Sequence, residues 1–77
     1  MIKDWEDEFH FIKTDEEIGK HSIITTYKHS FVRNKTVIET VRKCDGFCYF
    51  IYKDKYSHRA CRTVEKLTQI LEKENLK

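Results

Sequence analysis

The sequence predicts an α+β domain: a small antiparallel β-meander of three to four strands, with one C-terminal amphipathic helix packed on the sheet. Two segments rich in β-branched and aromatic residues, 36–44 and 47–53, flank Asp45-Gly46, a pair favoured in tight hairpin turns. A third such segment, 21–30, has no helical periodicity. An apolar stripe with helical spacing follows these segments and needs a sheet to cover it.

The hairpin also predicts a register. A two-residue turn pairs Cys44 with Phe47 and Val41 with Phe50. Because side chains alternate along a strand, one face of this hairpin then becomes apolar. That predicted face consists of Val37, Val41, Cys48 and Phe50.

The C-terminal helix is predicted over 58–76, with Ser57 as its N-cap. Ala60, Val64, Leu67 and Leu71 recur at helical spacing and form its apolar stripe. The chain has no proline, only two glycines and no linker-like tract, so residues 1–77 are expected to form a single domain. Within it, we expect an antiparallel sheet over 20–53.

The N-terminal segment 1–18 is an acidic arm or a first strand. Residues 9–13 are aromatic and consistent with a short strand, whereas the acids before them are also consistent with a helix. Residues 14–17 are predicted to form a polar connector. Residues 1–18 carry seven acids against two lysines, whereas residues 19–62 carry ten lysines or arginines against three acids. The sequence therefore predicts an acidic arm joined to a basic body.

The small size argues against an enzyme. A domain of this length buries only about 60% of the surface of its unfolded chain, which makes a deep substrate cleft hard to build. None of the four histidines is spaced to activate a serine or cysteine in a recognisable motif. The chain has no apolar segment near the length of a membrane span and no apolar signal-peptide region at its start, so we expect a cytoplasmic protein.

The cysteines allow three interpretations. Cys44, Cys48, His58 and Cys61 are residue types that bind zinc, and a metal would stabilise a small core. Their spacing departs from common zinc motifs, and Cys44 and Cys48 should point to opposite faces of a regular hairpin. Buried structural thiols are therefore the favoured interpretation, with no cofactor, and a disulfide between two of the three cysteines is the third.

The leading functional hypothesis is a non-enzymatic protein that docks on a partner protein. Acids that flank large aromatics suit a basic groove, because aromatics anchor interfaces while charges steer the encounter. In size and general character the chain resembles the small accessory proteins of phages and mobile elements, many of which inhibit a host enzyme by docking on it. The resemblance covers no specific motif. If the partner is a nucleic-acid enzyme, the acids of this segment would stand in for phosphates. The predicted partner-binding residues are Trp5, Glu6, Asp7, Glu8 and Phe9.

The alternative hypothesis is a nucleic-acid-binding module with a basic-aromatic sheet face, with or without zinc. Cations bind phosphates and aromatic faces stack on bases. The residues predicted for this role are Lys28, Arg33, Lys35, Arg42, Lys43 and Tyr49. A homodimer is a further expectation, through an exposed edge strand at 21–30 that pairs with its copy.

Overall fold

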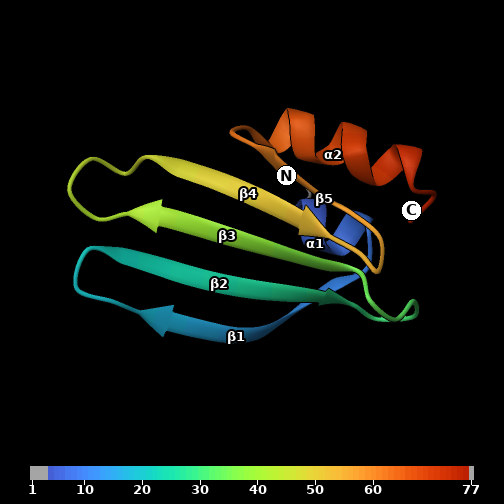
Figure 1. Ribbon diagram of the computed structural model, residues 1–77, viewed down its shortest axis with the longest axis horizontal. Coiled ribbons are helices and arrows are strands. Elements are labelled where there is room, and N and C mark those ends of the chain that lie inside the picture. The colour runs from blue at the N-terminus through green and yellow to red at the C-terminus, as the bar shows by residue number, and fades with distance from the viewer. Residues whose placement is uncertain (1–3, 77) are drawn as a thin grey trace.

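The computed structural model describes residues 4–76 and contains one five-stranded antiparallel sheet with strands in the order β1-β2-β3-β4-β5 (Figure 1). Each strand pairs with its neighbour in sequence, as the predicted meander requires. The elements are α1 (Trp5–Glu8), β1 (Phe11–Ile18), β2 (Ser22–His29), β3 (Thr36–Arg42), β4 (Cys48–Lys53), β5 (His58–Cys61) and α2 (Val64–Lys73).

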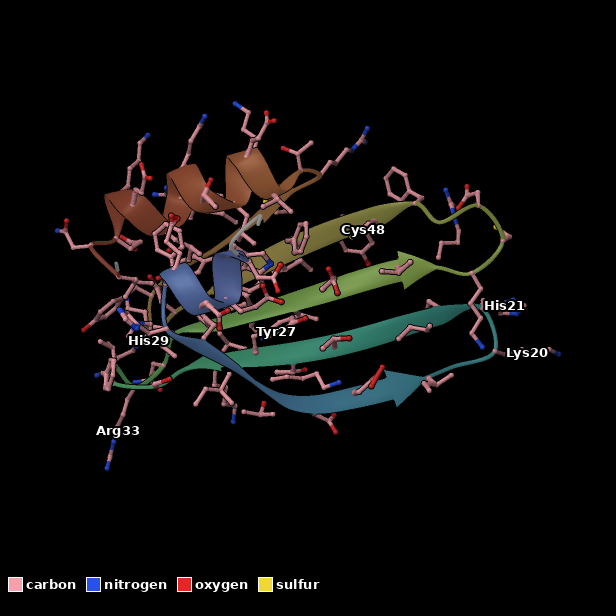
Figure 2. The ribbon with its side chains drawn as sticks, turned by 180° about the vertical axis from the view of Figure 1, so that it is seen from behind. Lys20, His21, Tyr27, His29, Arg33 and Cys48 are labelled. Carbon is pink, nitrogen blue, oxygen red and sulfur yellow. The ribbon has the colours of Figure 1, made fainter. Side chains whose placement is uncertain are left out.

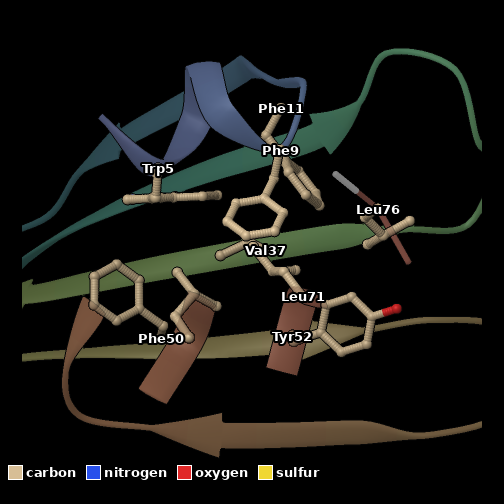
Figure 3. Packing of buried hydrophobic residues seen from close by; sticks show 9 residues of the cluster. Trp5, Phe9, Phe11, Val37, Phe50, Tyr52, Leu71 and Leu76 are labelled. Atoms are coloured by element: carbon tan, nitrogen blue, oxygen red, sulfur yellow. The ribbon is translucent and has the colours of Figure 1, made fainter. Parts of the chain in front are cut away.

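Both helices pack on the same side of the sheet, which we call the covered face. Figure 2 looks onto this side, where α1 crosses in front of the strands. The core lies between helices and sheet and joins side chains from α1, β1, β3, β4 and α2 (Figure 3). Its buried members are Trp5, Phe9, Phe11, Val37, Phe50, Tyr52, Leu67, Leu71 and Leu76.

The opposite side, which we call the open face, has no helix over it (Figure 1). The strand register and the alternation of side chains assign residues to this face. None of these side chains on β2–β5 is buried; all are half-buried or exposed. They are Ser22, Ile24, Thr26 and Lys28 on β2, Thr36, Ile38, Thr40 and Arg42 on β3, Tyr49, Ile51 and Lys53 on β4, and His58 and Ala60 on β5.

The β3–β4 hairpin confirms the predicted faces but not the predicted turn. Val41 pairs with Cys48, which shifts the register by two residues from the prediction and lengthens the loop. The Asp45 carboxylate explains the longer loop, because it accepts the Phe47 amide and the Arg42 guanidinium, both at 3.0 Å. A shift of two residues keeps every side chain on its face, so the predicted apolar face is the covered one.

The predicted helix 58–76 was wrong at its start, because His58–Cys61 forms β5. The Asp54 carboxylate accepts the Tyr56 and Ser57 amides, both at 2.8 Å, and so reverses the chain after β4. Ser57 therefore belongs to a turn. The helix begins after Thr63, whose hydroxyl accepts the Lys66 amide at 3.1 Å.

The later start of α2 changes its predicted apolar stripe. Leu67 and Leu71 are buried as expected, whereas Val64 at the helix start is 46% exposed. Ala60 lies outside the helix, on the open face of β5. A helix packed on the sheet is confirmed, with fewer of its residues in the core than the sequence suggested.

The N-terminal segment contains both of its predicted alternatives. Trp5–Glu8 is a short helix, and the following strand, β1, runs from Phe11 to Ile18. The predicted connector 14–17 was wrong, because it continues β1 after a register shift between Lys13 and Asp15. The sheet therefore has five strands, whereas the sequence predicted three to four. The predicted edge strand at 21–30 was also wrong, because β2 lies between β1 and β3.

The Asp54 turn predicts a specific pH dependence. The Ser57 and Tyr56 amides, with Lys35 nearby, lower the pKa of Asp54 from 3.8 to about 2. A lowered folded-state pKa stabilises the fold above the unfolded-state value, and this contribution is lost as pH falls through the folded-state value. Asp54→Asn keeps an acceptor oxygen but cannot ionise. We expect its free energy of unfolding, from urea titrations, to fall less than that of the wild type between pH 3.8 and about 2. Parallel pH profiles would contradict this role of the carboxylate.

Candidate nucleic-acid interface

The predicted docking aromatics lie in the core. Trp5 is 7% exposed and Phe9 is fully buried. The Trp5 ring contacts Tyr27 edge-on, with centroids 4.9 Å apart, and lies 5.5 Å from Phe11. These contacts anchor α1 to the sheet, so neither ring is free to anchor a partner in this conformation.

The acids of the predicted docking segment are only partly available. Asp7 is exposed, whereas Glu6 and Glu8 are half-buried. Burial, then the charges of Glu39 and Glu6, raise the pKa of Tyr27 to about 12. The Glu6 carboxylate therefore lies close to the Tyr27 hydroxyl, on the covered face of β2.

The predicted zinc ligands do not converge. Cys48 and Cys61 lie on the covered face, on β4 and β5, while Cys44 is exposed in the β3–β4 loop. His58 pairs with Lys53 at the opposite end of β4 from Cys48. Within residues 4–76, no group of three or more His, Cys, Asp or Glu side chains is placed to hold a metal ion.

The open face carries most of the predicted basic-aromatic surface. Between residues 22 and 60, its strand positions on β2–β5 include cations but no carboxylate. Within residues 4–76, the strand carboxylates on this side are Asp15 and Glu17 on the edge strand β1, and Asp45 of the β3–β4 loop binds Arg42. The lysine, arginine and histidine side chains on the open face of β2–β5 are Lys28, Arg42, Lys53 and His58.

One corner of the open face combines aromatic rings with guanidinium groups. The rings of Phe47 and Tyr49 have centroids 6.3 Å apart. The guanidinium carbons of Arg42 and Arg62 lie 5.0 and 5.6 Å from the centroid of the Phe47 ring. An open hollow of about 280 Å³ lies here, lined by Phe47, Tyr49, Ala60, Cys61 and Arg62. A planar base could stack here with positive charge beside it.

The other end of the open face meets the β2–β3 loop, which His29 holds in place. His29 Nδ1 accepts the amides of Phe31 and Val32 at 3.1 and 3.0 Å. Because Nδ1 accepts, Nε2 carries the ring proton and donates to the Leu76 carbonyl at 3.3 Å. Figure 2 shows His29 and Arg33 at this end, with Arg33 pointing away from the sheet.

The six residues of the nucleic-acid prediction thus fall into separate places. Lys28 and Tyr49 lie on the open face, and Arg33 lies in the loop beside its end. Arg42 and Lys43 lie at the opposite end. Lys35 is less available, because its ammonium lies 3.5 Å from the Asp54 carboxylate.

The six residues of the nucleic-acid prediction omit Phe47, Lys53, His58 and Arg62, which belong to this surface. Phe47, Tyr49, Ile51 and Lys53 share one parity along the chain. This shared parity is the signal in the sequence that could have assigned Phe47 to the same face as Tyr49. Tyr27 and Tyr52, which also lie in the basic half of the sequence, face the core instead.

Comparison with known proteins adds no family to this description. No protein-family model, no curated protein and no solved structure matches the chain. Among residues 4–76, no helix is both long and apolar enough to cross a membrane.

The three thiols should differ in reactivity. Burial raises the pKa of Cys48 and of Cys61, and Cys48 also faces the Glu39 carboxylate at 3.9 Å. Because the thiolate is the nucleophile, we expect N-ethylmaleimide to modify exposed Cys44 first and the other two slowly. Peptide mass spectrometry after timed labelling measures this order, and labelling in denaturant provides the control in which all three react. Equal rates in the folded protein would contradict the described burial.

Proposed function

We propose that this protein is a non-enzymatic binding module that holds a single-stranded nucleic acid on the open face of its sheet. The observation that carries the proposal is the charge of that face. Its strand positions on β2–β5 bear Lys28, Arg42 and Lys53 and no carboxylate. The acids beside them are Asp15 and Glu17 on β1 and Asp45, which binds Arg42. Phosphate groups are the polyanionic partner that such a surface favours.

The aromatic corner supports a single strand rather than a duplex. Unpaired bases stack on aromatic side chains and guanidinium planes, whereas a duplex hides its base faces. Phe47 is 38% exposed, and the guanidinium groups of Arg42 and Arg62 lie next to its ring. Thr26, Thr36 and Thr40 add hydroxyl groups between the cationic ends of the face. Phosphate contacts would position the strand, and stacking would hold its bases.

The docking hypothesis is the second candidate. Asp7 is exposed on α1, and this helix lies on the covered face, so a basic partner could approach without touching the open face. Because Trp5 and Phe9 support the core, a variant that tests this hypothesis should change only Glu6, Asp7 and Glu8. The docking candidate also includes two further predictions: the partner is a nucleic-acid enzyme, and the protein originates from a phage or mobile element.

The nucleic-acid proposal predicts a face-specific effect of charge. Lys28→Gln combined with Lys53→Gln should weaken binding to a fluorescent single-stranded oligonucleotide. It should also reduce the slope of log K against log salt by about 1.4, because each phosphate contact contributes about 0.7 for single strands. Fluorescence anisotropy over a salt series measures both quantities.

The matched control removes the same charge from α2, with Lys66→Gln and Lys73→Gln. This control should keep the wild-type slope. An equal loss in both double variants would indicate attraction to net charge alone, and no binding by the wild type at low salt would rule the proposal out. Phe47→Ala should weaken binding with little change in slope, because stacking does not release counterions.

A further inference from the structure

The tips of two hairpins meet at one end of the sheet, at the left in Figure 1. The β1–β2 turn and the β3–β4 loop are joined there by a hydrogen bond from the Lys43 amide to the His21 carbonyl, at 2.9 Å. The two tips enclose an open notch of about 490 Å³. Its lining residues are Lys20, His21, Arg42, Lys43 and Cys44.

Two of the three lysine or arginine side chains that line the notch have no acid close to them in the described part of the chain. Among residues 4–76, no carboxylate lies within 4.0 Å of the ammonium group of Lys20 or Lys43. Arg42 differs, because Asp45 binds its guanidinium through two contacts of 3.0 Å. This pair fixes the position of Arg42 at the border between notch and open face. Lys20 and His21 lie at the end of the sheet in Figure 2, far from His29 and Arg33.

A phosphate monoester is the anion that fits this chemistry. It carries a charge of about −1.5 to −2 and three acceptor oxygens, more than the single charge of an internal phosphodiester. Two ammonium groups and an imidazole can donate to these oxygens. We propose that the notch binds a phosphate monoester, and that its source is the terminal phosphate of the strand held on the open face.

This assignment of the source rests on the proposed function. Arg42 lines the notch and also contacts the Phe47 ring at the aromatic corner, so the two sites adjoin. A strand that stacks at Phe47 and Tyr49 would reach the notch where the sheet ends. A free phosphate compound is the other source of the same chemistry, and the experiment separates the two.

The test compares one oligonucleotide sequence with a 5′-phosphate, with a 3′-phosphate and with hydroxyl groups at both ends. One phosphorylated form should bind the wild type about fivefold to tenfold more tightly than the unphosphorylated form, as a few charge-assisted hydrogen bonds would give. In Lys20→Gln combined with Lys43→Gln, the ratio of the two affinities should fall to about one. Lys66→Gln combined with Lys73→Gln is the matched control and should retain the wild-type ratio.

Inorganic phosphate provides the second arm, followed through the NMR resonances of His21 and Lys43. Phosphate-induced shifts at these residues, without binding of any oligonucleotide, would keep the notch but assign it to a free phosphate compound, and would reject the proposed function. Equal affinities of the wild type for all three oligonucleotides would overturn the terminal-phosphate assignment. A preference that persists in the Lys20/Lys43 variant would overturn it as well.

Discussion

The structure depends on one constraint: the chain has enough large apolar side chains to cover one face of its sheet. Trp5 is central to this cover, because its ring contacts Phe11, Tyr27 and Phe50, which lie on three different strands. The helix α2 completes the cover with Leu67 and Leu71. Burial of this cluster on one side provides most of the apolar stabilisation of a small domain. The other side is therefore free to carry side chains that do not stabilise the fold.

The same constraint leaves the hairpin tips uncovered. The helices lie toward the end of the sheet where β4 finishes, and the β1–β2 and β3–β4 tips extend beyond them (Figure 1). Near the tips, Ile18 is 68% exposed, and its pairing partner Ile23 is only half-buried. Lysine side chains at these tips consequently remain in water, where their charge is available to a ligand. The cationic ends of the sheet and the open face thus have one cause: the large apolar side chains are concentrated on the covered face.

The sequence predicted what depends on alternation and periodicity. The covered face of the β3–β4 hairpin follows from side-chain parity, which tolerates a register error of two residues. It did not predict β5, because a serine after a turn suits a helix N-cap, whereas the Ser57 amide is part of the turn that the Asp54 carboxylate holds. The sequence also did not predict that Trp5 lies in the core. An aromatic beside acids suits either a docking surface or a core, and only the packing of α1 on the sheet decides between them.

The central claim is that the open face is the binding surface, and isoleucine methyl groups can test it directly. Ile38 and Ile51 lie on the open face, whereas Ile23 and Ile70 lie on the covered side. Methyl NMR spectra recorded at low salt, during titration with a single-stranded oligonucleotide, would report on both sides at once. The account predicts shifts at Ile38 and Ile51 while Ile23 and Ile70 stay in place. Shifts confined to Ile23 and Ile70, or no shifts at any of the four, would contradict it.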